Sequence, residues 1–211
     1  MKQKISLLFT LFYTILFLPT SSLFAQNTAI DSTFKRCFIG SSLFMLSNLD
    51  TKQKNPPQFY QLNLGYRITE KDVVSIEFKT WKYAWSLGIP FGDSFEASGE
   101  KFPGSIRTFG IALVYQRFLW KGLYTAVHAM NGSQTYLDIN NKKIQKGYQL
   151  FMSYRLGYHV PLFKKRFFIE PSVAITHRPI DTNMPANFKT LDEKWPKTFF
   201  PEPGLHFGYR F

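Results

Sequence analysis

The sequence predicts an all-β fold, an eight-stranded antiparallel up-and-down transmembrane β-barrel. Eight segments alternate apolar and polar side chains, as strands with one apolar face do. Beyond the N-terminal leader, no segment offers the ~18 uninterrupted apolar residues that a membrane-spanning helix needs. Short and long connections alternate strictly along the chain, which would place every long connection at one end of the sheet. A closed barrel is the way to cross a membrane with strands, because it pairs every backbone group.

Composition sets the first limits on the class of protein. A chain of 211 residues has room for one domain or two small ones. Aromatic residues make up 18% of it and charged residues 19%, which suits a chain with an apolar exterior. The net charge of +12 could indicate nucleic acid or an anionic lipid surface as a partner, and export would exclude nucleic acid. The single cysteine, Cys37, excludes an intramolecular disulfide.

The first 25 residues have the pattern of a secretory signal peptide. Two lysines stand among the first four residues, an apolar run extends to Leu18, and small and polar residues lead to Ala25. We therefore expect a signal peptide at 1–25, cleaved after Ala25, and a barrel domain at 26–211. The alternative is an N-terminal membrane anchor, but the apolar run is short for a ~20-residue span.

The eight expected strands approach the ~9–11 residues that a tilted membrane strand needs. They are 35–46, 59–68, 73–82, 106–119, 123–130, 148–162, 167–176 and 204–211. In the second, Leu62 and Leu64 share one face and Gln61 and Asn63 the other. The pattern does not fix the facing of the first and fifth. In the seventh, Pro171 removes a ladder donor, and we interpret it as a bulge.

The connections between these strands differ in length and charge. Tight turns are expected at 69–72, 120–122 and 163–166, and long connections at 47–58, 83–105, 131–147 and 177–203. The tight turns carry much of the basic excess, whereas the four long connections together are nearly neutral. The sequence therefore predicts a basic turn end.

Aromatic residues flank both kinds of connection, which predicts two aromatic girdles at the membrane interfaces. The girdle beside the short turns would contain Phe118, Trp120, Tyr124, Phe163 and Phe167. The girdle beside the long loops would contain Tyr83, Trp85, Trp195, Phe199 and Phe200.

The segment 204–211 carries the resemblance to a known family. Its residues 205, 207, 209 and 211 are apolar or aromatic, its intervening residues are small or polar, and it closes on Phe211. Together with the upstream pattern over 35–211, it resembles the small eight-stranded outer-membrane β-barrel proteins such as the OmpA transmembrane domain, OmpX and OmpW.

That resemblance implies a location rather than an activity. It implies a porin-like membrane protein of the Gram-negative outer membrane, exported with a cleaved signal peptide and monomeric. Its partners would be outer-membrane lipid and the barrel-assembly machinery. The machinery would recognise the C-terminal strand through Phe207, Tyr209 and Phe211.

The polar faces of the strands predict what fills the barrel. An eight-stranded barrel has an interior only wide enough for side chains or one small ligand. We expect an ion-paired polar plug, with a narrow basic pore or ligand cavity as the alternative. In the expected register Ser75 lies opposite Arg67, with Glu77 as its diagonal neighbour. The predicted lumen network is Arg67, Glu77, Lys79, Arg155, His159, Glu170, His206 and Arg210.

Two functions from different classes fit this architecture. The first is a barrel without catalytic activity, either structural or binding a small solute or ligand. The second is a lipid-modifying enzyme like the lipid A acyltransferase and deacylase barrels. The deacylase uses a His-x-Ser pair that this sequence lacks, so His177, near Asp181, is the histidine to test. None of the four histidines has metal-site spacing, and no cofactor or metal is expected.

Overall fold

A computed structural model describes residues 35–49, 57–83, 103–193 and 196–211. They belong to one compact unit, Lys35–Phe211. The expected signal peptide at 1–25 and the start of the mature chain lie outside the described residues. Within those residues, no helix is both long and apolar enough to cross a membrane.

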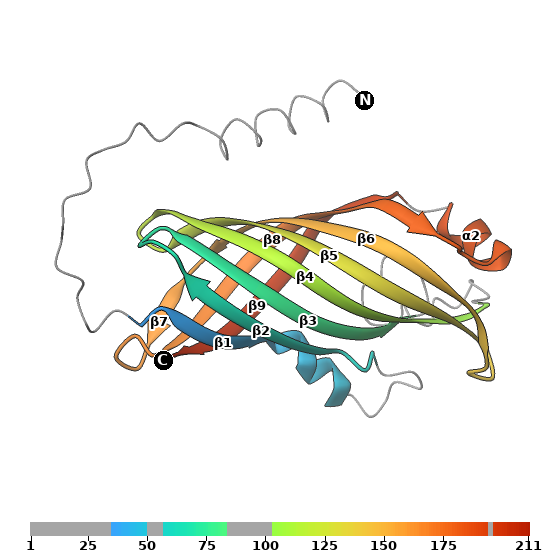
Figure 1. Ribbon diagram of the computed structural model, residues 1–211, viewed down its shortest axis with the longest axis horizontal. Helices are drawn as coiled ribbons and strands as arrows, with labels where there is room; N and C mark the ends of the chain where they lie inside the picture. The colour runs from blue at the N-terminus through green and yellow to red at the C-terminus, as the bar shows by residue number, and fades with distance from the viewer. Residues whose placement is uncertain (1–34, 50–56, 84–102, 194–195) are drawn as a thin grey trace, which may run out of the picture. The chain divides into compact units, whose positions relative to one another are not determined.

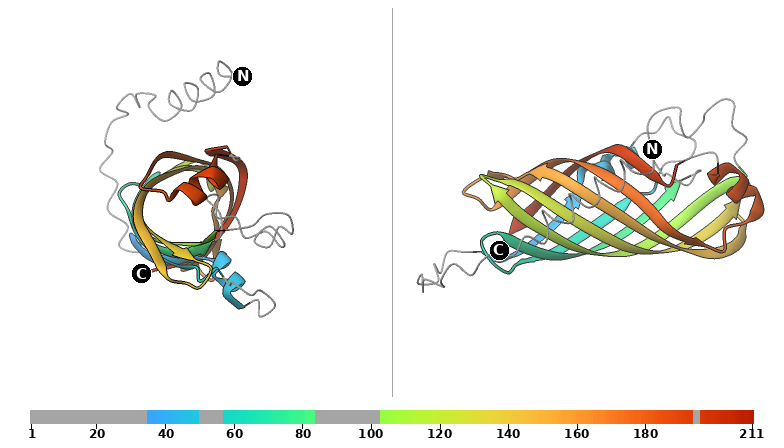
Figure 2. Two further views of the ribbon diagram at one scale, coloured as in Figure 1. Left: turned by 90° about the vertical axis from the view of Figure 1, so that its right-hand side faces the viewer. Right: turned by 90° about the horizontal axis from the view of Figure 1, so that it is seen from above.

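The described unit is all-β, with an antiparallel sheet that closes into a ring of eight strands (Figures 1 and 2). Successive strands pair with each other, and the β1–β9 and β6–β8 pairings close the ring. The strands are β1 (Cys37–Ser42), β2 (Tyr60–Arg67), β3 (Asp72–Tyr83), β4 (Gly104–Trp120), β5 (Leu123–Asp138), β6 (Lys143–Tyr158), β7 (Val160–Leu162), β8 (Phe167–Thr182) and β9 (Thr198–Arg210). This confirms the predicted antiparallel ring of eight, to which the short β7 adds a ninth strand paired with β8.

The three predicted tight turns are confirmed, and they lie with the end of β9 at one end of the ring (Figure 1). Lys121 and Gly122 have φ angles of 42° and 94°, as a two-residue turn between twisted strands requires. The predicted long connection at 131–147 is wrong, because β5 and β6 stay paired up to a turn at 139–142. The connection at 177–203 is partly wrong too. Strand β8 extends to Thr182, and a short helix, α2 (Ala186–Asp192), precedes β9.

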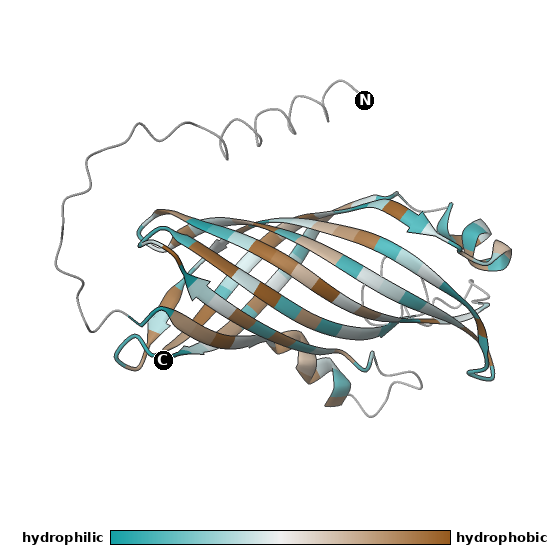
Figure 3. Ribbon diagram, viewed as in Figure 1, coloured by the Kyte–Doolittle hydropathy of each residue, from teal (hydrophilic) through white to brown (hydrophobic). Residues whose placement is uncertain are grey.

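The apolar faces of the strands point outward and the polar faces inward. Leu64 is 46% exposed, whereas its neighbour Asn63 is 8% exposed. Across the sheet, Ile76 and Leu113 are likewise exposed, whereas Glu77 is 2% exposed. Figure 3 shows the resulting alternation along the strands, with hydrophilic residues concentrated at the turns and hairpin tips. The facing predicted from the alternation is therefore confirmed in these strands.

In the interior, aromatic rings pack over glycines of the neighbouring strand. Gly157 lies opposite Tyr124, whose ring fills the space where a Cβ of residue 157 would stand. Phe38 covers Gly65 in the same way. Tyr124 and Phe118 therefore point inward, and their assignment to the turn-end girdle is wrong. Trp120, Phe163 and Phe167 are exposed, as the girdle requires.

The long-loop girdle is revised as well. Tyr83 is buried inside the ring, so it does not belong to an outer girdle. Phe200 is exposed on β9, and Phe199 is half-buried. Trp85 and Trp195 lie outside the described residues.

One seam of the ring is closed without strand pairing. The expected strand at 35–46 ends at Ser42, and the 3₁₀ helix η1 (Leu43–Leu49) follows it. Among the described residues, no strand continues β1 between β2 and the first half of β9. The Asn48 side chain instead bonds both backbone groups of Phe59, at 2.7 and 2.8 Å. On the opposite edge of the seam, Pro201 and Pro203 lack N–H donors.

Candidate functional site: the polar interior

The turn end of the interior holds a linear hydrogen-bonded chain. Nη2 of Arg210 lies 2.6 Å from Nε2 of His159, whose Nδ1 lies 2.7 Å from Oε1 of Glu170. Gln116 donates to the same Oε1 at 3.2 Å. Because a guanidinium can only donate, Nε2 of His159 accepts, and Nδ1 carries the proton shared with Glu170. Strands β4, β8 and β9 and the link between β6 and β7 each contribute one member.

Aromatic rings support the cations of this layer. The Arg67 guanidinium lies 4.6 Å from the centroid of the Phe118 ring, and that of Arg210 lies 5.4 Å from the centroid of Phe168. Contacts of this kind favour a cation that has lost part of its hydration. They explain why inward-facing aromatics accompany the charged residues at this end.

The middle of the interior holds two further ionic groups. Oε2 of Glu77 lies 3.6 Å from Nζ of Lys79 and 3.3 Å from Nδ1 of His128. Across the ring, Arg155 donates to Glu202 at 3.1 Å and to Ser172 at 3.0 Å. Glu77 and Arg155 therefore each have a partner of opposite charge, as burial of charge requires.

Two small cavities lie in this part of the interior. A cavity of about 30 Å³ is lined by residues of both layers, among them Glu77, Arg155, Glu170 and His206. A neighbouring cavity near Arg67 and Arg210 measures about 10 Å³. The larger has room for about two water molecules. Side chains therefore fill this part of the ring.

At the opposite end of the ring, α2 lies over one side of the opening (Figure 2). Phe188 of α2 packs with Tyr136 and Ile106 in a buried cluster. Arg178, 1% exposed, pairs with Asp181 at 3.3 Å and with Asp192 of α2 at 2.8 Å. Burial of Phe188 and the Arg178–Asp192 pair together hold α2 in the mouth.

The structure brings the eight predicted lumen residues to inward-facing positions, but in separate layers. The predicted register at the first turn is wrong. Arg67 lies opposite Val73, and Glu77 lies opposite Asn63, so Arg67 and Glu77 are not neighbours. Glu77 pairs with Lys79 and His128 instead.

Sequence reasoning missed several inward-facing residues. His128 lies on the fifth segment, whose facing was not fixed, and the alternation of Tyr124, Ala126 and Met130 could have placed it inside. Arg178 and Asp192 were assigned to a loop. No pattern in the sequence indicated that α2 would return to the mouth.

The residues proposed for an enzyme are not brought together. His177 lies on an outward-facing position of β8, and its Nδ1 is 2.9 Å from Oγ1 of Thr198. Asp181 interacts instead with Arg178 and with Gln149, which donates to it at 2.9 Å. Within the described residues, no group of three or more His, Cys, Asp or Glu could hold a metal ion.

Comparison with known proteins adds no family. Neither a protein-family model nor a curated protein sequence matches this chain.

Proposed function

We propose that this chain is an integral outer-membrane β-barrel protein without catalytic activity. The observation that carries the proposal is the reversed polarity of the closed ring, with Leu64, Ile76 and Leu113 exposed and Glu77, Arg155 and Glu170 buried. In water, such an exterior would leave a continuous apolar belt unsatisfied. In a bilayer, the same belt faces hydrocarbon, and the closed ring leaves few backbone groups unpaired.

The lengths of the strands support a membrane-spanning role. Strands β4, β5, β6 and β8 each have 16 or 17 residues, more than the ~9–11 that cross a bilayer at a tilt. They would therefore project beyond the membrane at the end covered by α2. The short turns at the opposite end would face the periplasm.

The packed interior supports a structural or ligand-binding barrel over an open channel. Ionic and aromatic layers lie in the interior, α2 lies at the far mouth, and two cavities toward the turn end measure about 30 and 10 Å³. A steady flow of solute would need the ionic layers to separate, which leaves buried charges unpaired. We propose a largely plugged polar lumen.

Export and assembly complete the proposal. The leader at 1–25 would direct export and be cleaved after Ala25. The outward-facing aromatics of the last strand, Phe207 and Phe211, are exposed and would remain available to the barrel-assembly machinery together with Tyr209. The mature protein would be a monomer in the outer membrane.

Cell fractionation and gel mobility test this function. We expect the mature protein in the outer-membrane fraction, and a mobility in SDS gels that changes on boiling, because a closed ring resists unfolding by detergent. In planar bilayers we expect no conductance, or only small and sporadic events. A soluble periplasmic protein would exclude the membrane role, and steady anion-selective conductance would replace the plug with a basic pore.

A further inference from the structure

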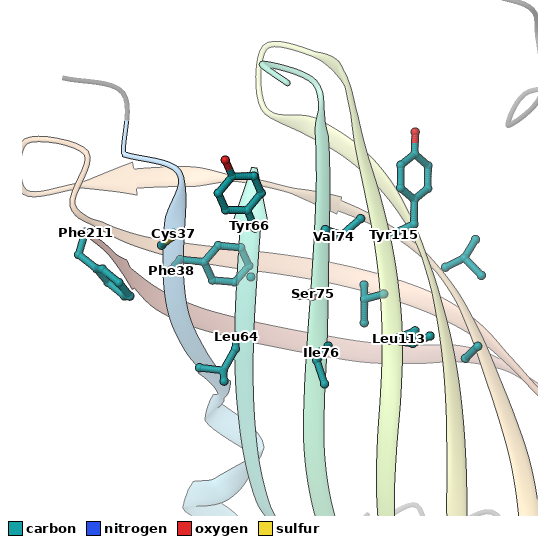
Figure 4. A pocket seen from close by; sticks show the side chains of 14 residues that line it. Cys37, Phe38, Leu64, Tyr66, Val74, Ser75, Ile76, Leu113, Tyr115 and Phe211 are labelled. Carbon is teal, nitrogen blue, oxygen red and sulfur yellow. The ribbon is translucent and has the colours of Figure 1, made fainter. Parts of the chain in front are cut away.

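The outer face of the ring carries an apolar groove over strands β1 to β5 (Figure 4). Its volume is about 790 Å³, within the range of small-molecule sites. The outward-facing Leu64, Ile76 and Leu113 line it, together with Val127 and Ala129 of β5. The groove therefore has the size and lining of a site for a hydrocarbon chain.

One end of this groove is polar. Tyr66 and Tyr115 line it, and in Figure 4 both hydroxyls point toward the turn end, away from Leu64 and Ile76. Arg36 donates to the Tyr66 hydroxyl at 3.3 Å and is exposed. In the part of the chain that the structure describes, no carboxylate pairs with Arg36.

The neighbouring hydroxyl is already engaged. Tyr115 donates to Asp72 at 2.7 Å, and Arg117 neutralises that carboxylate at 2.9 Å. Arg36 is therefore the cation bonded to a hydroxyl of the groove that no described carboxylate neutralises. With Tyr66 it could bind a phosphate oxygen through two donors.

The wider turn end is strongly basic, which sets the charge of the occupant. The side-chain carboxylates at this end are Glu70, Asp72 and, inside the ring near Arg67 and Arg210, Glu170. The cations are Lys35, Arg36, Arg67, Lys71, Arg117, Lys121, Lys164, Lys165, Arg166 and Arg210. Such a rim beside an apolar belt complements an anionic lipid surface.

We infer that the groove binds an anionic phospholipid from the leaflet next to the short turns. One acyl chain lies along Leu64, Ile76 and Leu113, and the phosphate accepts from Arg36 and the Tyr66 hydroxyl. This inference rests on the proposed membrane location. A second copy of the chain fits less well, because a symmetric dimer through this face would bring two sets of the same cations together.

Native mass spectrometry of the full mature protein tests the inference. The protein is released from detergent micelles that contain equal amounts of phosphatidylglycerol and phosphatidylcholine. We expect one retained phosphatidylglycerol, about fivefold preferred, the effect of one basic side chain at an anionic surface. Arg36→Gln should remove the preference, because phosphatidylglycerol retention falls more than that of phosphatidylcholine, whose choline group already offsets the phosphate charge. Ala129→Phe, which narrows the groove, should lower retention of both lipids.

Lys165→Gln is the matched control, because it removes a turn-end cation away from the groove. Its lipid preference should equal that of the wild type. If Lys165→Gln and Arg36→Gln lose the phosphatidylglycerol preference equally, the basic rim acts as a whole. That result would overturn the groove site. A dimer mass that disappears in Ala129→Phe would assign the groove to a second copy and overturn it too.

Heat-modifiable mobility of each variant separates this inference from the proposed function. If the variants stay heat-modifiable but retain both lipids like the wild type, the lipid site is refuted. The proposed barrel is not affected by that result. Loss of heat modifiability in the wild type itself would refute the barrel. If Ala129→Phe fails to fold, Tyr66→Phe replaces it, and retention of both lipids should fall, because both carry the phosphate that loses a donor.

Discussion

His159 joins a cation to an anion inside the ring: its Nδ1 lies 2.7 Å from Glu170 and its Nε2 lies 2.6 Å from Arg210. The three side chains come from different places in the sequence and close the turn end of the interior. Because Gln116 also donates to Glu170, this carboxylate is the common acceptor of the layer. The stability of the layer should therefore depend on it.

Glu170→Ala should lower the free energy of unfolding by about 3 kcal/mol, because each buried donor left without its acceptor costs roughly 1–3 kcal/mol. It leaves His159 and Gln116 without their acceptor and Arg210 without a nearby negative charge. The measurement is urea unfolding of protein refolded in lipid vesicles, followed by tryptophan fluorescence.

Leu113→Ala is the control, because this outward-facing side chain is 64% exposed and, in the proposed membrane location, exchanges only lipid contact. It should cost clearly less than Glu170→Ala. Glu170→Gln keeps an acceptor oxygen and should fall between the two. If Leu113→Ala and Glu170→Ala cost the same, the interior is not held by its ionic layer.

Gly157→Ala should destabilise the fold, because the new methyl group would meet the ring of Tyr124. Overpacking of this kind typically costs about 1–3 kcal/mol. The same unfolding measurement in vesicles gives the cost.

A double variant tests the cause. In Tyr124→Leu the ring is gone, so adding Gly157→Ala should cost much less than it does in the wild type. Equal costs in both backgrounds would show that the methyl group does not meet Tyr124. The pair would then be additive, as distant residues are.

Leu64→Arg and Leu156→Arg should each cost about 2–4 kcal/mol, the price of a cation near the bilayer midplane. Both side chains are exposed on the outer face. Asn140→Arg, in the exposed turn between β5 and β6, should cost little. Unfolding in vesicles compares the three, and equal tolerance at all sites would refute the assigned lipid face.

Most of the fold could be predicted because alternation is a local signal. The faces of β2 and β3 follow from which residues are two apart, and the tight turns follow from the breaks between them. The hairpin β5–β6 was cut short because Asn131, Gly132 and Ser133 have the composition of a loop. In the structure these residues belong to a paired strand, where pairing with β4 and β6 overrides their low strand propensity.

The interior was predictable in composition but not in partners. Which residues face inward follows from the alternation of side chains along each strand. Whether Glu77 meets Arg67 depends instead on the register at the turn, because a shift in register changes every cross-strand partner. The Arg178–Asp192 pair depends on α2 folding back over the mouth, which no local pattern encodes. For the same reason, Phe118, Tyr124 and Tyr83 were placed in girdles although they fill the interior.

The seam between β2 and β9 provides the last test, because one side chain replaces a strand there. Asn48 donates to the carbonyl oxygen of Phe59 at 2.7 Å and accepts from its N–H at 2.8 Å, as a paired strand residue would. Asn48→Ala leaves both groups without partners, each at a cost of roughly 1–3 kcal/mol. We expect the free energy of unfolding in vesicles to fall by about 2 kcal/mol or more, and hydrogen exchange of the Phe59 amide to become faster. Ser47→Ala, which removes one bond to the Phe44 carbonyl within η1, should leave that amide protected. Unchanged exchange at Phe59 in Asn48→Ala would mean that the rest of η1, not this side chain, closes the seam.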